Sequence, residues 1–403
     1  MSAQTNGGLI VVGGGPAGLG AARAYREAGA GGAVLLVSAD PDAPYHRPPL
    51  TKDYLRGESG PDELPLVEPS WYIEHDVKLR LNTTVTGVDL AAQRVSFGDQ
   101  TAAGYDRLIL ATGSDPRQLP VPGGDLPGLI HVRDRESADA MRAVSGPGRR
   151  VAVLGSGFVG CEAAASLAMT GTDVVLVTDE DAPHASRLGT DAGGRIHTWL
   201  TEVGVELRTG DAVAQIARDE RWTLTLEGGD NLVVDAVVVG GGARPNVDLA
   251  RTAGLRLGAQ GIEVDAGMLT SDPHVWAAGD IAHADNPAAG RALRVEHWGE
   301  AEAMGEVAGA NAAGGTRAWA QAPGFWSTIG THTLKYAAWG DGYDRAELRN
   351  RPGAEGWAVW YLTDETVVGV VTSDWDDAYE RGQQLVEAHA PASQIPASRI
   401  GPS

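Results

Sequence analysis

The sequence predicts an α/β protein in which two similar βαβ units are joined to a small C-terminal α+β domain. The first unit is indicated by "LIVVGGGPAGLG", which begins at Leu9 as an apolar strand and passes through a glycine turn into an alanine-rich helix. The same succession recurs in "VAVLGSGFVGCE", which begins at Val151. From about Phe325 the chain changes to short aromatic and β-branched segments, which are typical of antiparallel strands.

Both glycine turns fit the pattern G-x-G-x-x-G between a strand and a helix. The glycines of the pattern are Gly13, Gly15, Gly18, Gly155, Gly157 and Gly160. The first glycine allows a tight turn, the second lets the backbone approach a pyrophosphate, and the third lets helix and strand pack closely. The helix start adds free N–H groups and the positive end of the helix dipole. Two matches in the same context predict two Rossmann-like dinucleotide-binding domains.

The remaining elements follow in the same order in the two halves of the chain. A second apolar strand, a run of meander strands and a buried strand with a glycine turn are expected at 33–38, 77–99 and 105–117, and again at 173–178, 204–236 and 237–242. A further strand over 274–280 ends at Asp280. We therefore expect a discontinuous domain, 1–115 with 250–324, a second domain, 116–249, and a C-terminal α+β domain, 325–403.

Within the C-terminal domain, the pattern predicts a hairpin turn at Thr363-Asp364-Glu365 and an amphipathic helix from Asp376. The tail after Pro391 is rich in Pro, Ser and Ala and is expected to be loose.

Composition excludes several classes of function. The formal net charge of −21 disfavours binding to nucleic acid, which requires clustered Lys and Arg. No apolar run approaches the ~18 residues that a membrane span requires, and "MSAQTNGG" lacks the features of a signal peptide. We expect a soluble, cytoplasmic protein. No cluster of His, Cys and acidic residues with metal-ligand spacing is present in the sequence, and nothing in it indicates the oligomeric state.

The single cysteine, Cys161, excludes an internal disulfide and a redox-active dithiol. It stands near the start of the second glycine-turn helix, where the helix end can lower the pKa of a thiol. A reactive thiol that forms a sulfenic acid is one interpretation. We favour the other, a packing residue, because free Cys is usually buried and inert.

These motifs together resemble those of the flavoprotein reductases with two dinucleotide domains. The resemblance is strongest to the FAD-dependent NAD(P)H:ferredoxin reductases that serve Rieske oxygenases and cytochromes P450. The stretches that carry it are "GGGPAG", "PYHRPPLTKDYL", "ATGSDPR", "GSGFVGCE", "GGARPNVDLA", "HVWAAGDIA", "RVEHWGEA" and "FWSTIG". The resemblance implies FAD in the first domain, NAD(P)H in the second, and a flavin that receives electrons in pairs and passes them singly to an iron–sulfur protein.

The resemblance also implies a set of cofactor-binding residues. They are Gly13, Gly15, Pro16, Ala17, Gly18, Ser38, Asp40, Arg47, Lys52, Val85, Ala111, Thr112, Gly113, Arg133, Gly155, Gly157, Phe158, Val159, Gly160, Thr178, Gly241, Gly279, Asp280, Glu296, His297, Trp298 and Trp326. Among them, Arg47 and Lys52 lie on the segment that crosses the flavin, and Asp280 matches an acid that binds its ribityl or phosphate region. Trp298 and Trp326 match positions beside the isoalloxazine; as plain core aromatics they would have no such role.

Lys52 and Glu162 are the expected catalytic pair. In the related reductases these two positions face each other beside the flavin, where an ammonium stabilises the reduced anion and a carboxylate holds the ammonium. The alternative is two unrelated charges, with Glu162 stabilised by the helix dipole in the first turn of its helix.

The acid that normally binds the adenosine ribose is displaced in both units. Its usual position falls at Ser38 and at Thr178, and acids follow at Asp40 and at Asp179-Glu180. An acid here accepts from the 2′-hydroxyl of NADH, whereas a 2′-phosphate requires a cation, for which Arg187 is the candidate. The sequence favours NADH.

The electron acceptor is the least specified part of the function. Between Arg317 and Arg351 five basic residues stand against three acids, a balance that can steer an acidic ferredoxin. Two alternatives stay open: a reductase of oxygen, a quinone or another small molecule, and a nucleotide-sensing flavoprotein of the apoptosis-inducing-factor type.

Anaerobic reduction of the FAD-loaded protein should take up two electrons per chain and then stop, because the lone Cys161 leaves no dithiol to accept a second pair. Titration with dithionite, followed at the flavin absorbance band, measures this. Uptake of four electrons would show a second acceptor that the sequence does not contain.

Overall fold

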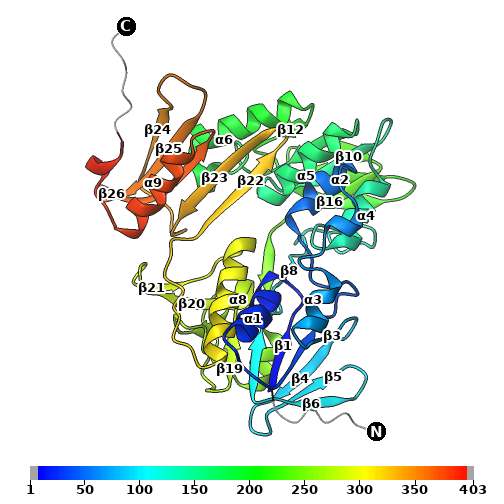
Figure 1. Ribbon diagram of the computed structural model, residues 1–403. Helices are drawn as coiled ribbons and strands as arrows, with labels where there is room; N and C mark the ends of the chain where they lie inside the picture. The colour runs from blue at the N-terminus through cyan, green and yellow to red at the C-terminus, as the bar shows by residue number, and fades with distance from the viewer. Residues whose placement is uncertain (1–7, 397–403) are drawn as a thin grey trace. The chain divides into compact units, whose positions relative to one another are not determined.

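The computed structural model describes residues 8–396, and the chain divides into two compact units (Figure 1). The first unit contains residues 8–46, 64–115 and 245–324 of this range, and the second contains 47–63, 116–244 and 325–396. The expectations for residues 1–7 and for the end of the tail, 397–403, lie outside the described residues.

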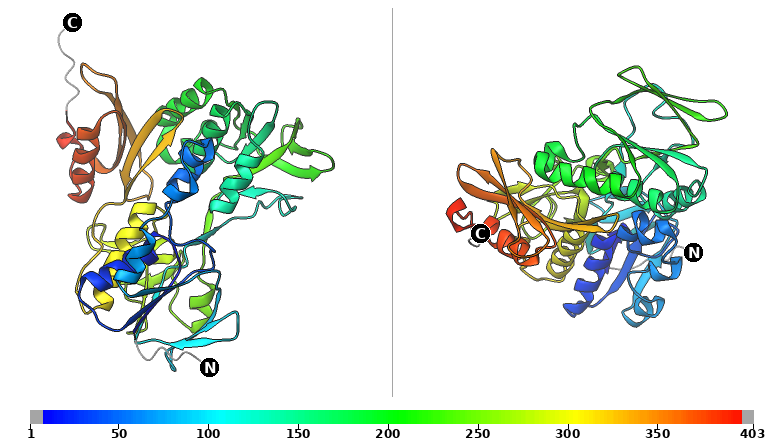
Figure 2. Two further views of the ribbon diagram at one scale, coloured as in Figure 1. Left: turned by 45° about the vertical axis from the view of Figure 1, so that its right-hand side comes forward. Right: turned by 90° about the horizontal axis from the view of Figure 1, so that it is seen from above.

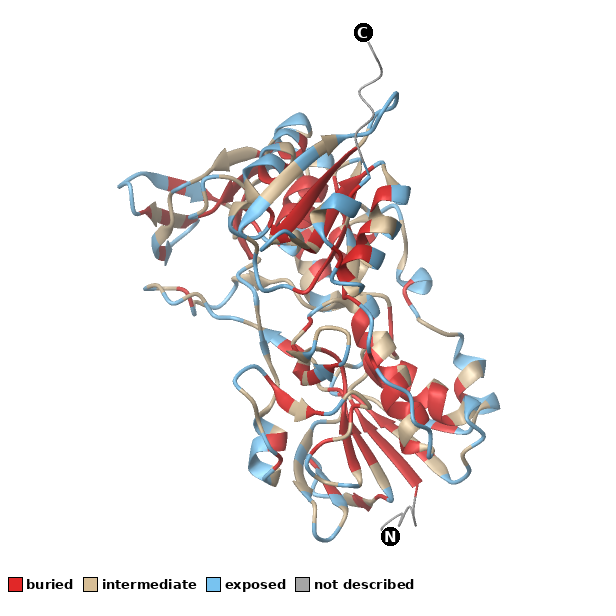
Figure 3. Cartoon of the chain, turned by 90° about the vertical axis from the view of Figure 1, so that its left-hand side faces the viewer, coloured by how far each residue is buried: buried red, intermediate tan, exposed pale blue. Residues whose placement is uncertain are grey.

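A five-stranded parallel sheet forms the centre of the first unit. Its strands, in spatial order, are β19 (Val275–Ala277), β7 (Arg107–Leu110), β1 (Gly8–Val12), β2 (Ala33–Val37) and β3 (Val77–Arg80). β1, β19 and, after Arg107, β7 are apolar and buried, as expected of a parallel sheet that helices cover on its faces (Figure 3). The edge strand β3 corrects one prediction: this segment pairs in parallel with β2 instead of opening a meander.

Two helices, α1 (Pro16–Glu27) and α8 (Trp298–Ala312), lie side by side in the first unit (Figure 2). Two glycines of α8 make this approach possible. A Cβ at Gly305 would lie 2.1 Å from the backbone oxygen of Ala17, and one at Gly309 would lie 2.0 Å from that of Ala21. The glycines therefore hold the two helix backbones closer than side chains would permit.

Smaller elements complete the first unit. The meander predicted near 85–104 is the antiparallel sheet of β4 (Val85–Asp89), β5 (Arg94–Phe97) and β6 (Ala102–Gly104). A second small sheet contains β18 (Ile262–Val264), β20 (Ala282–Asn286) and β21 (Arg291–Leu293). The helices α3 (Pro69–Glu74) and α7 (Asp248–Ala253) and the 3-10 turn η3 (Gly279–Ile281) also belong here.

The second unit contains a parallel sheet of the same kind. Its strands, in order, are β12 (Glu206–Arg208), β11 (Asp173–Val177), β10 (Arg150–Leu154), β16 (Ala236–Val239) and β9 (Ile130–His131). Its helices are α2 (Asp53–Arg56), α4 (Arg135–Ala143), α5 (Phe158–Met169) and α6 (Ala185–Glu202), and η1 (Pro48–Thr51) and η2 (Pro61–Glu63) precede them or stand between them. As with β3 in the first unit, β12 pairs in parallel with its neighbour and is not part of the predicted meander. The meander is shorter than predicted and contains β13 (Val213–Arg218), β14 (Trp222–Leu226) and β15 (Asn231–Val234).

The C-terminal residues of the second unit form an antiparallel sheet covered by a helix. The strands, in order, are β22 (Gly324–Ile329), β23 (His332–Ala338), β26 (Thr366–Ser373), β25 (Trp357–Thr363) and β24 (Arg345–Asn350). α9 (Asp376–Glu387) contacts β26 and β23, and η4 (Ala392–Gln394) follows it. The predicted hairpin turn is present, with positive φ at Asp364 and Glu365, as a tight turn with right-handed strand twist requires.

The short strands β8 (Ser114–Pro116) and β17 (Ala243–Pro245) stand at two of the places where the chain passes from one unit to the other. Among the described residues, none of the helices combines the length and the apolar character needed to span a bilayer.

Substitution of Gly309 by Ala should lower the free energy of unfolding by about 1–3 kcal/mol, because the new methyl group would overlap the backbone of α1. Gly299→Ala on the same helix is the matched control, since no atom lies within 4 Å of its Cβ position. Its effect should stay within about 1 kcal/mol. Chemical denaturation measures both variants, and equal effects would show that helix propensity, rather than the close approach, controls these positions.

Candidate functional site

The predicted cofactor residues divide between the two units. The first unit holds Gly13, Gly15, Pro16, Ala17, Gly18, Ser38, Asp40, Val85, Ala111, Thr112, Gly113, Gly279, Asp280, Glu296, His297 and Trp298. The second holds Arg47, Lys52, Arg133, Gly155, Gly157, Phe158, Val159, Gly160, Thr178, Gly241 and Trp326, together with Glu162 of the predicted catalytic pair. In each unit most of them follow the carboxyl ends of the parallel strands, which is where doubly wound sheets bind ligands.

The first glycine turn has the geometry of a nucleotide cradle. Gly13 has φ of 125°, and a Cβ there would lie 2.0 Å from the backbone oxygen of Ala111. A Cβ at Gly18 would lie 2.0 Å from the oxygen of Gly13, so this glycine lets α1 pack on the turn. The middle glycine differs: nothing lies within 4 Å of a Cβ at Gly15. The start of α1 is therefore open at the position where a pyrophosphate would approach the backbone.

The second glycine turn repeats this geometry in the other unit. Gly155 has φ of 96°, and a Cβ there would lie 2.8 Å from the backbone oxygen of Gly240. A Cβ at Gly160 would lie 2.1 Å from the oxygen of Gly155, whereas Gly157 is open, with its nearest neighbour 4.0 Å away. In both cradles, backbone atoms leave no room for a side chain at the first and third glycines, whereas space remains beside the second. Both cradles therefore fit a dinucleotide in the same way.

An acid follows the last strand of the first unit's sheet. Asp280 lies in η3, directly after β19, and its Oδ2 accepts a hydrogen bond of 2.6 Å from Ser114. Thr112 donates to the backbone oxygen of Asn246 at 2.9 Å. Sequence reasoning selected Asp280 and Thr112 but missed Ser114, because nothing local in the sequence pairs a hydroxyl with an acid more than a hundred residues away.

Trp298, the first residue of α8, stacks on an aromatic partner that the sequence did not indicate. Its ring lies 5.4 Å from that of His46, with the planes 29° apart. Its Nε1 is buried, and no described residue accepts a hydrogen bond from it. A buried indole N–H of this kind suits an acceptor atom on a bound group. His297 stands directly before the same helix, and Glu296 forms an ion pair with Arg294.

The end of the second strand of the first unit carries a hydroxyl and an acid in a fixed arrangement. Ser38 is buried, and its Oγ accepts from the backbone N–H of Asp40 at 3.2 Å. The Asp40 carboxylate accepts from the hydroxyl of Tyr45 at 3.0 Å. The acid thus stands two residues after the usual ribose position at Ser38, and Tyr45 holds its carboxylate.

The second unit has the same arrangement at the same place. Thr178 Oγ1 accepts from the backbone N–H of Glu180 at 3.2 Å and lies 2.8 Å from the hydroxyl of Ser156. The Glu180 carboxylate accepts from the Ser186 hydroxyl at 2.8 Å, whereas Asp179 is exposed. Of the two acids left open by the sequence, Glu180 is the one held in place at the strand end.

Arg187, the cation considered for a 2′-phosphate, is held by aromatic rings. Its guanidinium lies 5.4 Å from the ring centre of Tyr336, 5.9 Å from that of Phe158 and 6.0 Å from that of Phe325. Cation–π contacts of this kind tie the charge to the C-terminal sheet and to the first residue of α5. His184 stacks on Phe158 at 3.8 Å, and burial together with the nearby Arg187 lowers the pKa of its imidazole to about 3.

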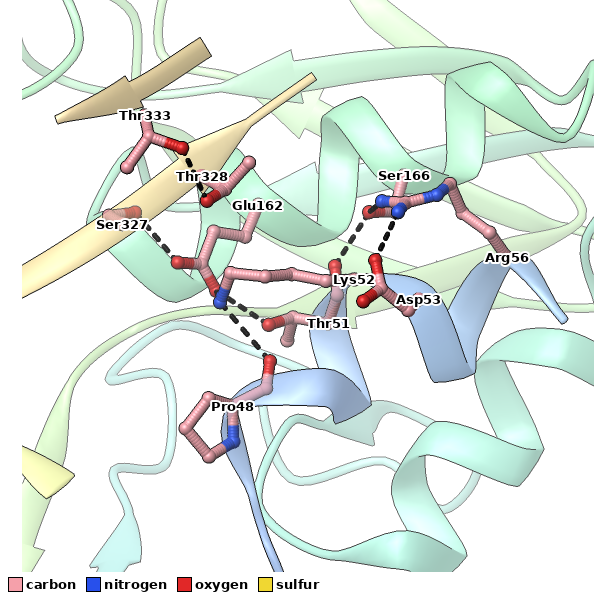
Figure 4. A network of polar contacts seen from close by, with 10 residues as sticks. All are labelled: Pro48, Thr51, Lys52, Asp53, Arg56, Glu162, Ser166, Ser327, Thr328 and Thr333. Carbon is pink, nitrogen blue, oxygen red and sulfur yellow. Dashed lines mark hydrogen bonds and ion pairs between the residues drawn. The ribbon is translucent and has the colours of Figure 1, made fainter. Parts of the chain in front are cut away.

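The predicted pair is in contact within the second unit (Figure 4). Lys52 Nζ lies 2.6 Å from Glu162 Oε2 and donates to the backbone oxygen of Pro48 at 3.1 Å. Glu162 is 6% exposed, so the carboxylate is withdrawn from water. One expectation is corrected: Glu162 is the fifth residue of α5, past its first turn, where the helix dipole acts weakly. Direct donors therefore stabilise this carboxylate.

The segment that carries Lys52 is anchored on both sides. Lys52 follows η1 and precedes α2, and the hydroxyl of Ser166 on α5 donates to the backbone oxygen of Thr51 at 2.7 Å. Arg47 donates to the backbone oxygen of Arg133 at 2.6 Å, which brings together two residues from the predicted cofactor set. Because the segment packs on α5, it belongs to the same unit as Glu162.

Cys161 is a packing residue. It is completely buried, its Sγ donates to the backbone oxygen of Ser156 at 3.3 Å, and burial raises the pKa of its thiol, with the charges of Glu162 and Glu180 adding to the rise. The direction is opposite to the lowering that a helix end can cause, and it agrees with the packing interpretation. The thiolate needed for sulfenic acid chemistry is therefore suppressed.

The basic residues of the C-terminal sheet are mostly neutralised. Lys335 contacts Asp376 at 2.7 Å, Arg345 contacts Glu365 at 2.9 Å, and Arg349 contacts Glu347 at 2.9 Å; Arg351 donates to the backbone of Asp374. These ion pairs weaken the positive electrostatic field that the excess of basic residues predicts for this region.

Two Rossmann-like cradles and a buried Lys–Glu pair define a two-nucleotide flavoprotein reductase. The chain belongs to the pyridine nucleotide-disulphide oxidoreductase family, whose model matches residues 8–305, and a Reductase C-terminal model matches residues 324–398. The predicted class, an FAD- and NAD(P)H-dependent reductase with a C-terminal α+β domain, is confirmed. No group of His, Cys and acidic residues in the described part of the chain is arranged to hold a metal ion.

The similarity extends over nearly the whole chain. Rhodocoxin reductase of Rhodococcus erythropolis is 34% identical over 90% of this chain and 85% of the relative. The ferredoxin–NAD(+) reductase component of the anthranilate 1,2-dioxygenase system of Burkholderia cepacia is 36% identical over 79% of each chain. Among solved structures, the covalent putidaredoxin reductase–putidaredoxin complex matches with a TM-score of 0.90 and 30% identity, over 96% of this chain and 94% of the other.

The pKa of His184 gives a test by pH. Because this pKa is about 3 in the folded protein against an ordinary value of 6.5, the unfolded chain binds the proton first as the pH falls. Relative to His184→Leu, the wild type should lose about 1.4 kcal/mol of unfolding free energy per pH unit between pH 6 and pH 4. Above pH 7 the difference should be constant. Parallel stability curves for the two proteins would mean that the imidazole is protonated in the folded state.

Proposed function

We propose that the protein transfers electrons from NADH, through FAD, to a small ferredoxin-type iron–sulfur protein that serves an oxygenase or a cytochrome P450. The observation that carries the proposal is the buried contact of Lys52 with Glu162 on the helix that follows the second nucleotide cradle. The similarity to a ferredoxin–NAD(+) reductase component and to a reductase solved with its iron–sulfur partner supports the choice of acceptor. We place the reaction in the cytoplasm.

Each unit holds one nucleotide in this proposal. The first cradle, with Gly15 open and Asp280 beyond the sheet, binds FAD, and the second, with Gly157 open, binds NADH. FAD, when bound, accepts an electron pair and supplies electrons singly. The protein contributes binding, orientation and fixed charge.

Lys52 provides the fixed positive charge. Two of the three protons of its ammonium are directed to Glu162 and to the oxygen of Pro48, which leaves one for a further acceptor. An ammonium held in this way stabilises negative charge that develops on the cofactor without reorganising at the moment of reaction. Glu162 holds that ammonium, and its own burial keeps water from screening the pair.

The strand-end acid selects NADH over NADPH. Glu180 presents a carboxylate that Ser186 holds in place, and such a carboxylate accepts from a ribose 2′-hydroxyl but repels a 2′-phosphate. Arg187 does not offset this repulsion, because its guanidinium is engaged by Tyr336 and the neighbouring rings. Two alternatives stay open. Reduction of oxygen or a quinone differs from the proposal only in the acceptor, whereas a nucleotide-sensing role with little turnover is a different class of function.

The proposal is tested with the FAD-loaded full-length protein under anaerobic conditions. NADH should reduce the flavin with a kcat/KM at least about tenfold above that of NADPH, a difference of about 1.4 kcal/mol. Reduced enzyme should then reduce putidaredoxin or another [2Fe–2S] ferredoxin faster than menadione or oxygen, measured by stopped-flow absorbance. Faster reduction of menadione or oxygen than of every ferredoxin tried would replace the acceptor, and a persistent charge-transfer band with little turnover would favour the sensor.

A further inference from the structure

The Glu162 carboxylate receives three donors, and they divide unevenly between its two oxygens (Figure 4). Oε2 accepts from Lys52 at 2.6 Å and from the Thr51 hydroxyl at 2.6 Å. Oε1 accepts from the Ser327 hydroxyl at 2.7 Å. Ser327 is 1% exposed, so water does not replace its hydroxyl in the folded protein. One side of the carboxylate is thus held by the Lys52 segment and the other by β22.

Ser327 reaches Glu162 because of its position on β22. Side chains alternate along a strand, so Ser327 faces the second unit's interior while its neighbours Trp326 and Thr328 face the other way. Trp326 is 56% exposed, and Thr328 Oγ1 lies 2.9 Å from Thr333 Oγ1 on β23. Pairing of β22 with β23 in the sheet fixes the strand, and the strand fixes the Ser327 hydroxyl.

We propose that Ser327 is a positioning residue for the reductase reaction. Its hydroxyl sets the rotation of the Glu162 carboxylate and, through Oε2, the position of the Lys52 ammonium. The proposal rests on the proposed function, in which Lys52 acts on the bound flavin. It assigns to the C-terminal part of the chain, which carries Ser327, a direct share in the geometry of the Lys52–Glu162 pair.

The physical reason is the burial of the carboxylate. Without the Ser327 hydroxyl, Oε1 would lose the one donor that the described residues give it, and a buried carboxylate oxygen without a donor is costly. The carboxylate would turn toward whatever donors remain, Thr51 and Lys52. That rotation would draw the ammonium with it and away from the position that the flavin requires.

The test compares Ser327→Ala with Ser327→Thr, which keeps the hydroxyl, and with Thr328→Val. The last variant is the matched control, because it removes a hydroxyl from the same strand on the opposite side. For each FAD-loaded variant, stopped-flow absorbance gives the rate of flavin reduction by NADH, and spectroelectrochemistry gives the midpoint potential of the flavin. Chemical denaturation reports the stability separately.

Ser327→Ala should slow flavin reduction about tenfold and make the midpoint potential more negative, whereas Ser327→Thr and Thr328→Val should do neither. In a Glu162→Gln background, Ser327→Ala should cause no further change, since the hydroxyl acts through the carboxylate. If Ser327→Ala does not bind FAD, Ser327→Cys, a near-isosteric weak donor, takes its place with the same expectations.

The proposal is overturned if Ser327→Ala lowers only the stability, with the rate and the potential of the wild type retained. It is overturned equally if the effects of Ser327→Ala and Glu162→Gln simply add. Failure of the proposed function would be seen elsewhere, in a wild type that NADH reduces but that reduces no ferredoxin.

Discussion

The arrangement of the predicted Lys52–Glu162 pair depends on the hydrogen bonds that the buried Glu162 carboxylate accepts. An ionised group that is 6% exposed persists only when donors replace its water, and here an ammonium and two hydroxyls do so. The donors come from the Lys52 segment and from β22, which are distant from α5 in the chain. The donors to this one carboxylate therefore come from two other segments of the second unit, and the Lys52 ammonium is held as part of the same network.

The two nucleotide cradles show how little local sequence a binding fold requires. In both units the first and third glycines are closed against backbone and the middle one is open, although the remaining residues of the two turns differ. The close approach of the turn to the neighbouring strand at Ala111 and at Gly240 explains why a side chain is not tolerated. The same steric constraint therefore accounts for the same glycine spacing in both units.

In both units a hydroxyl residue occupies the position where an acid usually binds the adenosine ribose, and the acid follows two residues later. Ser38 and Thr178 occupy the usual ribose position with a hydroxyl that accepts from the backbone two residues on. That short turn places Asp40 and Glu180 beyond the strand, and Tyr45 and Ser186 then hold their carboxylates. The hydroxyl thus forms a local turn at the strand end, and the acid that follows this turn is two residues farther along the chain.

The sequence by itself determined the fold class, the repeated cradles, the absence of a redox dithiol and the candidate pair Lys52 and Glu162. The fold class and the cradles follow from local periodicity and glycine spacing, since backbone constraints of that kind act within a few residues. The missing dithiol follows from the single cysteine, and the pair is implied by the resemblance to related reductases. Other features depended on the tertiary structure. β3 and β12 joined parallel sheets because strand pairing is non-local. Burial raises the pKa of the Cys161 thiol, and no local pattern in the sequence shows that burial. Ser327 could be assigned only once β22 lay against α5, because a hydrogen bond between residues so far apart leaves no local pattern in the chain.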